Sequence, residues 1–241
     1  MYAGGEELRF EGKHVVKVFD EVAATYDRGR WSWYRGVAKL AEGLGSPLLD
    51  VGAGTGAVAC ILASKGVEVV AADSSLGMLR ILWRRARRRR VGGYVNPVAA
   101  HLPLLPFRDQ CFAGVLAVAT IHHVYGRQRR VESLKELLRV VRAGGRCVVT
   151  VWYRYHPKNL LRALKWLLKG WEWGDVLAPW RKQGTVLERY YHLYGVGELK
   201  RDLRAAGAEV LKVELWDPRH GVFFKRNVLA VFTRGKGCTH L

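Results

Sequence analysis

The segment 47–75 constrains the fold of this chain more than any other part of its sequence. An apolar run, 47–51, ends in the glycine-rich turn Gly52-Ala-Gly-Thr-Gly56, and small apolar residues then continue at helical spacing. A second apolar run, 67–72, leads into Asp73-Ser-Ser75, where a side-chain oxygen can cap the next helix. A strand, a glycine turn, a helix and a second strand in this order open a doubly wound α/β fold.

The alternation of strands and helices continues as far as residue 152. Three more strands are expected, at 93–98, 112–119 and 146–152. An amphipathic helix that includes Leu134 and Leu137 is expected to end at Gly144-Gly145. The last apolar stretches, 208–216 and 227–233, lack room for a crossover helix between them and should pair antiparallel. The predicted fold is therefore α/β, with a doubly wound, mostly parallel seven-stranded sheet that ends in an antiparallel hairpin.

The whole chain, 1–241, is expected to form a single domain with two additions to the alternating core. Residues 1–45 contain two leading helices, at 14–27 and 33–43, which should lie over the ligand site. Residues 153–194 break the alternation and hold four tryptophans, five tyrosines and eight lysines or arginines. We interpret this basic, aromatic segment as an insertion or a lid.

The charge balance predicts an anionic partner. Lysine and arginine outnumber the acidic residues by 40 to 21, which gives a formal net charge of +19. A hydrophobic share of 49% excludes a disordered basic tail, because such chains lack the apolar residues needed to fold. Charge alone would fit either nucleic acid or an anionic membrane surface, although a heat-adapted source would also raise the arginine content.

We expect a soluble, cytoplasmic protein that has no membrane partner. The first residues lack the basic and apolar regions of a signal peptide, and no stretch of 18 apolar residues is present to span a bilayer. The cysteines form no Cys-x-x-Cys pair and no metal-ligand spacing, so they are predicted to be free thiols and no metal site is expected. They are Cys60, Cys111, Cys147 and Cys238.

Seven arginines lie between residues 80 and 90. On a helix, one side should carry Met78, Leu79, Leu82, Trp83 and Ala86. The other side should carry Arg80, Arg84, Arg87 and Arg88. This basic side is either a solvated helix face or a surface that follows the phosphates of RNA.

The glycine turn predicts a bound ligand, because a Cβ atom on Gly52 or Gly54 would obstruct a molecule lying close to the backbone. Asp73 lies 21 residues after Gly52, where its carboxylate can accept hydrogen bonds from two ribose hydroxyls. Both features also fit a dinucleotide such as NAD. Asp50 favours S-adenosylmethionine, because a carboxylate so close to the turn would repel a pyrophosphate but reach the amino-acid end of the methyl donor.

At these residues and at the terminal hairpin, the sequence resembles the class I S-adenosylmethionine-dependent methyltransferases. The resemblance implies S-adenosylmethionine as the cofactor, held by the glycine turn and covered by the leading segment. The residues expected at the donor site are Tyr26, Asp50, Gly52, Gly54, Gly56, Asp73, Ser74, His101, Leu102 and Ala119. His101 stands where the family usually has an aspartate for the adenine amino group, so this contact must change or move to the backbone.

Four distal segments carry a narrower resemblance. They are Thr120-Ile-His-His123, Arg127-Gln-Arg-Arg-Val-Glu132, Asp175-Val-Leu-Ala-Pro-Trp180 and Arg189-Tyr-Tyr-His-Leu-Tyr194. Over residues 15–233 the chain resembles the eukaryotic tRNA wobble-uridine carboxymethyl methyltransferases. This implies methyl transfer to a carboxymethyl oxygen on C5 of the wobble uridine, with the tRNA anticodon arm as substrate. It also implies a small zinc-binding activator subunit that forms a heterodimer with the enzyme.

The substrate side should hold an anion and a flipped base. The expected catalytic residues are Arg30, His122, Arg189, Tyr190 and Tyr191. The expected RNA-binding residues are His123 and Tyr194, together with the basic side of the helix, Arg80, Arg84, Arg87 and Arg88. A carboxylate is already ionised at pH 7 and needs no general base, so Arg30 or Arg189 would hold it while His122 donates a hydrogen bond. The tyrosines as a set would stack the base.

Two departures from the narrower family keep other functions open. Phe112-Ala113 replaces its usual Phe-Asp pair, and Val124-Tyr125 replaces the tryptophan that often follows the paired histidines. A methyltransferase for a small metabolite, such as a quinone or lipid precursor, would use the same donor residues. A non-catalytic RNA-binding module with the same fold would bind tRNA but not the donor.

Overall fold

The computed structural model describes residues 13–27, 31–168, 171–182, 185–218 and 226–235. Its main sheet has seven strands in the order β3-β2-β1-β4-β5-β9-β8. The strands are β1 (Leu48–Val51), β2 (Val69–Asp73), β3 (Val95–Ala99), β4 (Phe112–Val118), β5 (Val141–Trp152), β8 (Ala208–Trp216) and β9 (Asn227–Arg234). Strands β1 to β5 are parallel, and β9 runs antiparallel to both β5 and β8. The predicted fold class is confirmed, including the terminal hairpin.

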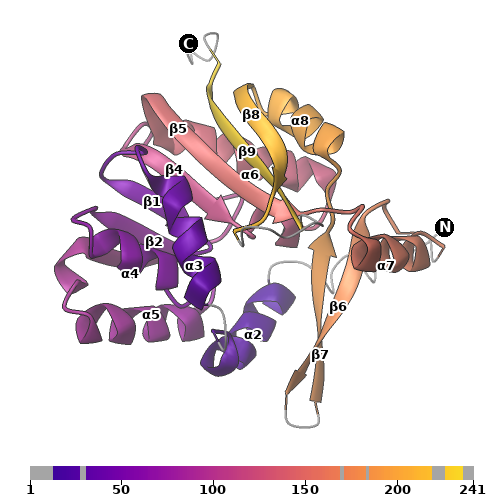
Figure 1. The fold of residues 1–241 in the computed structure, drawn as a ribbon, viewed down its shortest axis with the longest axis horizontal. Helices are drawn as coiled ribbons and strands as arrows, with labels where there is room; N and C mark the ends of the chain where they lie inside the picture. Colours follow the sequence, from indigo (N-terminus) through magenta and orange to yellow (C-terminus); the bar gives the residue numbers. More distant parts are fainter. Residues whose placement is uncertain (1–12, 28–30, 169–170, 183–184, 219–225, 236–241) are drawn as a thin grey trace.

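Helices cover both faces of this sheet (Figure 1). The described α-helices are α2 (Lys13–Val22), α3 (Trp31–Ala38), α4 (Ala57–Ala63), α5 (Leu76–Arg88), α6 (Arg127–Val140), α7 (Pro157–Leu167) and α8 (Val196–Ala205). Short 3-10 turns lie at 23–25, 39–41, 92–94 and 121–123. Side chains of α3, α4 and α5 pack on one face of the sheet, and those of α6 and α8 pack on the other.

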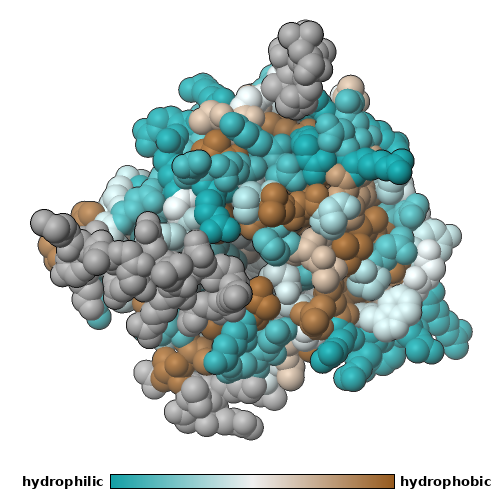
Figure 2. Space-filling model, turned by 180° about the vertical axis from the view of Figure 1, so that it is seen from behind, coloured by the Kyte–Doolittle hydropathy of each residue, from teal (hydrophilic) through white to brown (hydrophobic). Residues whose placement is uncertain are grey.

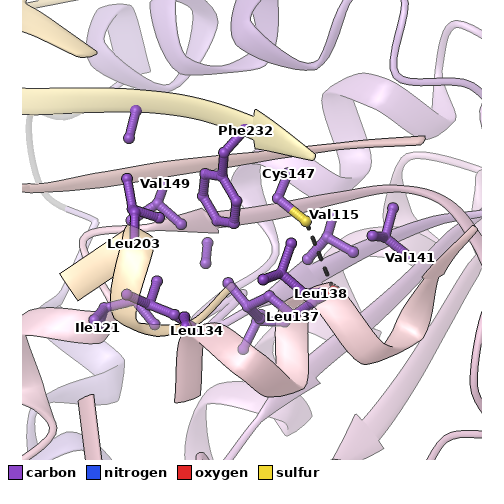
Figure 3. Close-up of a cluster of buried hydrophobic side chains, with 14 of the residues drawn as sticks. Val115, Ile121, Leu134, Leu137, Leu138, Val141, Cys147, Val149, Leu203 and Phe232 are labelled. Carbon is purple, nitrogen blue, oxygen red and sulfur yellow. Dashed lines mark hydrogen bonds between the residues drawn. The ribbon is translucent and has the colours of Figure 1, made fainter. Parts of the chain in front are cut away.

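The core between the sheet and α6 is a cluster of branched aliphatic side chains around Phe232 (Figure 3). Leu134 and Leu137 of α6 and Leu203 of α8 are fully buried there against the strands. The Cys147 thiol donates to the Leu137 carbonyl at 3.6 Å, so this cysteine is a packed core residue. Burying each such aliphatic side chain contributes about 1.5–3 kcal/mol, which fixes the sheet and therefore the strand ends that carry the site.

The segment 153–194 forms α7 and a separate two-stranded antiparallel sheet, β6 (Asp175–Lys182) and β7 (Thr185–His192). This hairpin extends away from the main sheet, with α7 beside it (Figure 1). Strand β7 contacts both α2 and the turn 121–123. The leading segment and the hairpin therefore meet at the edge of the sheet where its parallel strands end.

Two local predictions were wrong. Helix α6 ends at Val140, before the expected Gly144-Gly145, because Val141 is extended and pairs with Phe112 in the sheet. The glycines instead lie inside β5 at a register shift, where Gly145 approaches the Ala113 carbonyl so closely that a Cβ atom would lie 2.6 Å from it. Trp83 was expected on the buried side of α5 but is 43% exposed.

The rear face of the protein carries both polar and apolar surface. Figure 2 shows hydrophilic residues over its upper part and its lower right, with an apolar band between them. Within the described ranges, no helix is both long and apolar enough to cross a membrane.

Candidate active site

A first pocket, here called the glycine pocket, opens where β1, β2 and β4 end. Eight of the ten residues predicted for the donor site line it: Tyr26, Gly52, Gly54, Asp73, Ser74, His101, Leu102 and Ala119. They come from the leading segment and from the ends of four different strands. In open α/β sheets ligands bind at this carboxyl edge, so the fold brings these distant residues to the expected place.

The three glycines of the turn have positive φ values, but their surroundings differ. A Cβ atom on Gly52 would lie 2.2 Å from Thr120 Oγ1, and one on Gly56 would lie 2.3 Å from Leu82 Cγ. These neighbours, rather than a ligand, exclude side chains there, which corrects the reason expected for Gly52. A Cβ atom on Gly54 would meet nothing within 4 Å. Gly54 is thus the position where a side chain would take up open space at the pocket wall.

The carboxylate of Asp73 is held by the backbone of the turn and of the next helix. It accepts hydrogen bonds from the Gly54 amide at 2.7 Å and from the Ser75 amide at 2.9 Å. Ser75 in turn caps α5 by accepting from the Met78 amide at 3.0 Å. Burial raises the pKa of Asp73, and the two backbone amides oppose that rise. Its orientation is therefore fixed at the pocket wall.

Asp50, the remaining acid predicted here, is buried in the sheet and does not line the glycine pocket. Burial, with a smaller contribution from the charge of Asp73, raises its pKa to about 7. Its Oδ2 atom has no hydrogen-bond partner in the part of the chain that the structure describes. Gly56 also lies behind the pocket wall, against α5.

The leading segment is fixed over the glycine pocket by two aspartates that the sequence analysis did not single out. Asp20 accepts from the Ser75 hydroxyl at 2.5 Å and from the Gly77 amide at 2.8 Å. Asp27 accepts from the Thr55 hydroxyl and pairs with Arg85. Both contacts join residues far apart in the chain, so no local sequence pattern marks them.

A second pocket, here called the basic pocket, adjoins the first. Tyr26, Ala119 and His123 line both of them. Among the described residues, four cationic side chains and a single acid, Asp217, also line the basic pocket. The cations are Lys158, Arg162, Arg189 and Arg226. Such a lining favours an anionic ligand.

His122 is a neutral imidazole whose tautomer is fixed by the backbone. Its Nδ1 atom accepts a hydrogen bond from the Trp152 amide at 3.1 Å, so the ring proton is on Nε2. Complete burial, then the nearby charges of His123, His192 and Arg189, lower its pKa well below the usual value. Among the described residues, Nε2 has no partner. His122 is therefore a donor in the wall of the basic pocket.

His123 has the opposite tautomer. Its Nδ1–H donates to the Tyr190 carbonyl at 3.0 Å, which leaves Nε2 unprotonated. Burial lowers its pKa to about 3. His123 also packs against the Tyr191 ring with a centroid distance of 4.4 Å.

Arg189 lies between two aromatic rings. Its Cζ atom is 4.6 Å from the centroid of Trp180 and 5.2 Å from that of Tyr191. Its Nε atom is buried and has no partner in the described ranges. Tyr191 also stacks on Trp152 at 4.2 Å with an interplanar angle of 12°. These contacts fix the guanidinium plane through cation–π attraction.

The structure does not bring Tyr190 and Tyr194 to either pocket. The side chains of successive strand residues point to opposite faces, so Tyr190 points away from the face that carries Arg189 and Tyr191. Tyr190 is fully buried and donates to Asp175 at 2.7 Å. Tyr194 is also fully buried in the core. Neither ring offers a face to a base, which corrects the expected set of three stacking tyrosines. Arg30 lies outside the described residues.

The opposite face of β7 carries a buried ion network. His192 has Nδ1 2.6 Å from Asp175 and Nε2 2.9 Å from Glu198. Both neighbours are acceptors, so both ring nitrogens donate and the imidazole is charged. Glu172, Asp175 and His192 have ligating atoms within 4.8 Å of one another. Arg130, however, pairs with Glu172 at 2.8 Å, so these groups already satisfy each other as an ion network.

The parallel sheet with its terminal hairpin and glycine pocket defines a class I S-adenosylmethionine-dependent methyltransferase. A family model described as "Methyltransferase domain" matches residues 49–149. A solved structure, the CcbJ methyltransferase from Streptomyces caelestis, superposes with a TM-score of 0.69. The similarity covers 89% of this chain and 96% of that one at 19% sequence identity, so it bears on the fold.

The chain belongs to this methyltransferase family, and S-adenosylmethionine is its cofactor. It is 35% identical over 173 residues to a demethylmenaquinone methyltransferase of Thermobifida fusca, covering 68% of this chain and 71% of the relative. It is 26% identical over 224 residues to the tRNA (carboxymethyluridine(34)-5-O)-methyltransferase of Schizosaccharomyces pombe. That match covers 86% of this chain and 93% of the relative.

Proposed function

We propose that the protein methylates a carboxylate oxygen on tRNA, at the C5 carboxymethyl group of the wobble uridine. The observation that carries this proposal is a pair of buried nitrogens, His122 Nε2 and Arg189 Nε, in the basic pocket beside the glycine pocket, and neither has a partner among the residues that the structure describes. Leaving buried N–H groups unpaired costs about 1–3 kcal/mol each. A carboxylate supplies the acceptors that both donors lack, and the S. pombe relative is named for this reaction.

The residues of the glycine pocket fit S-adenosylmethionine. The turn leaves open space at Gly54, and Asp73 lies in the wall with its carboxylate oriented by two amides. We assign Asp73 to the ribose hydroxyls, and we assign the side chains after β3 to the adenine. The side chains of Leu102 and Met78 supply apolar wall, and His101 takes the place of the family's usual aspartate. Tyr26 closes the pocket from the leading segment.

In the basic pocket, the chain's own residues would orient the nucleophile. When bound, the donor supplies a methyl carbon on a sulfonium, which accepts an oxygen lone pair as sulfur leaves with its bonding electrons. His122 and Arg189 hold the carboxylate, while the stacked rings of Tyr191 and Trp152 exclude water. When two reacting groups are held in alignment, the effective concentration of one at the other can reach about 10⁵–10⁸ M. No proton has to be removed from a carboxylate at pH 7.

A second candidate, methylation of a small quinone precursor, is favoured by the T. fusca relative. A phenol or carbon acceptor would require a general base. His123 has an unprotonated Nε2 for that role and lines both pockets, but its pKa of about 3 makes it a weak base at neutral pH. The basic pocket therefore favours the carboxylate acceptor.

The test is to incubate the protein with methyl-labelled S-adenosylmethionine and bulk tRNA, with and without a small zinc-binding activator subunit. The proposal predicts label in tRNA that mild alkali releases, because methyl esters hydrolyse and C- or N-methyl groups do not. Mass analysis of the nucleosides should find the ester of carboxymethyluridine. Alkali-stable label would contradict the ester, and label in a quinol without tRNA would support the second candidate. Binding of tRNA with no affinity for the donor would instead indicate a non-catalytic module.

A further inference from the structure

The outer face of α5 carries an aromatic ring that its own core does not use. The apolar side of the helix is buried, with Met78, Leu82 and Ala86 at most 1% exposed. Trp83 lies outside this packed side at 43% exposure. Leaving so much of a tryptophan in water forgoes the burial energy that its large ring would supply. The ring is therefore available to a partner.

The exposed ring lies in a row of cations. Arg80, Trp83 and Arg87 follow a spacing of three and four residues, so they are neighbours on one face of the helix. Arg84 and Arg88 extend the same surface, and all four arginines are exposed. Across the described ranges none of these four has an acidic partner, whereas Arg85 pairs with Asp27. The surface formed by Arg80, Trp83, Arg84, Arg87 and Arg88 is called the arginine–tryptophan face below.

The composition of this face favours single-stranded nucleic acid. Arginines that lack carboxylate partners bind phosphates, and an aromatic ring between them stacks a base with little dependence on sequence. Duplex RNA hides its bases and would use the arginines alone. A membrane-bound helix would expose a broad apolar side, but here the apolar side of α5 faces its own core.

We propose that Trp83 stacks an unpaired base of the tRNA substrate while the flanking arginines hold its phosphates. This inference rests on the tRNA partner of the proposed function but concerns a separate site. Ser75 lies at the carboxyl edge of the sheet, and Trp83 is eight residues further along α5, about 12 Å by the helical rise. The stacked base is therefore a different nucleotide from the one that is methylated.

The experiment measures the affinity of the full-length protein for an anticodon stem-loop RNA by fluorescence anisotropy. Trp83→Leu should weaken binding about 5- to 150-fold, which corresponds to the loss of one stacked base, and Trp83→Phe should keep most of the affinity. Arg80→Gln with Arg87→Gln should lower the slope of log affinity against log salt by about 0.7–0.9 for each phosphate that the protein no longer neutralises. Arg201→Gln is the matched control, since it removes an exposed helical arginine of α8.

The variants separate failure of this inference from failure of the proposed function. If the unmodified protein binds no RNA at low salt, the tRNA substrate is wrong. If it binds RNA and Trp83→Leu binds equally well, the stacking site is wrong and the tRNA proposal stands. If Trp83→Leu lost as much affinity for a fully paired RNA duplex as for the stem-loop, this result would contradict stacking on an unpaired base. If Trp83→Leu kept its RNA affinity but lost binding to vesicles of anionic lipid, the arginine–tryptophan face would be a membrane-binding surface instead. Calorimetry with S-adenosylhomocysteine should show unchanged donor affinity in Trp83→Leu, which excludes misfolding.

Discussion

The carboxylate of Asp27 accepts the hydroxyl hydrogen bond of Thr55, with its two oxygens 2.7 and 2.8 Å from Thr55 Oγ1. This contact joins the leading segment directly to the glycine turn. Tyr34 donates to the same carboxylate at 2.7 Å, and Arg85 pairs with it. Burial alone would raise the pKa of Asp27, but the bonds from Arg85, Tyr34 and Thr55 outweigh it and lower the pKa. A charged Asp27 thus holds α2 over the glycine pocket.

Asp27→Asn should weaken the affinity for S-adenosylhomocysteine about tenfold, because the leading segment loses charged hydrogen bonds of about 1.5 kcal/mol or more. Isothermal calorimetry measures the change. Glu42→Gln is the control, since it breaks only an exposed pair with Lys65. Equal donor affinity in Asp27→Asn and the unmodified protein would show that the leading segment does not retain the donor.

Gly52→Ala and Gly54→Ala should separate folding from ligand binding. Gly52→Ala forces a Cβ atom to 2.2 Å from Thr120 at positive φ and should cost about 2–5 kcal/mol of unfolding free energy. Gly54→Ala meets no neighbour and should cost only about 1–2 kcal/mol, yet it should abolish donor binding. Denaturant melts and calorimetry on the same samples test both statements. A stable Gly54→Ala that binds the donor normally would remove this glycine from the site.

Arg189→Lys should lower kcat/KM for tRNA about 10- to 100-fold while leaving donor affinity unchanged. Lysine keeps the charge but loses the planar group that stacks between Trp180 and Tyr191 and the Nε–H that has no partner among the described residues. Steady-state kinetics with tRNA, beside calorimetry with S-adenosylhomocysteine, check the two parts. Arg204→Lys, on the exposed surface of α8, is the matched control. Unchanged tRNA kinetics in Arg189→Lys would exclude Arg189 from substrate binding.

His192 should make the stability of the protein fall as the pH rises above about 6.5. Burial by itself would lower its pKa, but hydrogen bonds to Asp175 and Glu198 raise it above the unfolded value. A pKa that is higher in the folded state stabilises fully below the unfolded pKa, and this stability is lost as pH rises through the folded pKa. Urea denaturation at pH 6, 7, 8 and 9 measures the decline.

The control for this pH dependence is a pair of histidine variants. His192→Gln cannot carry the charge, so its stability should be lower at pH 6 and should decline less steeply from pH 6 to 9. The decline that remains comes from buried Asp50, whose ionisation near its pKa of about 7 costs the folded state stability. His101→Gln, which changes an exposed histidine, should keep the decline of the unmodified protein. If His192→Gln shows the same slope as His101→Gln, then His192 is not charged in the native state.

The order of strands and helices could be predicted because it depends on local patterns. The apolar runs, the glycine turn and the Ser75 cap fix where elements begin, and the capping bond is present at 3.0 Å. The end of α6 could not be predicted from Gly144-Gly145, because the pairing of Val141 with Phe112 competes with helix continuation. Trp83 has the spacing of a core residue on α5. Whether a residue at the border of the apolar side of a helix is buried depends on the elements that pack against that helix.

The candidate site could be predicted only as far as the strand ends. Residues at the end of a strand, such as Asp73, or just after one, such as His122, come to the carboxyl edge in any fold of this class. The sequence could not tell which tyrosine of β7 lines the pocket. The two-residue period of a strand places Tyr190 and Tyr191 on opposite faces but does not say which face meets the pocket. Asp27 and Thr55 are 28 residues apart, and only tertiary packing joins them.

The sequence by itself determined the fold class and the position of the ligand-binding turn, because backbone conformation and hydrophobic periodicity are local properties of the chain. Gly54 with the apolar runs around it is enough to specify a strand–turn–helix that leaves room for a ligand. The tertiary structure alone decided the lining of the basic pocket, the tautomers of the two histidines and the exposure of Trp83. Hydrogen-bond partners and burial depend on which distant segments pack together, and a proton on Nε2 of His122 follows from the backbone of Trp152, thirty residues away in the chain.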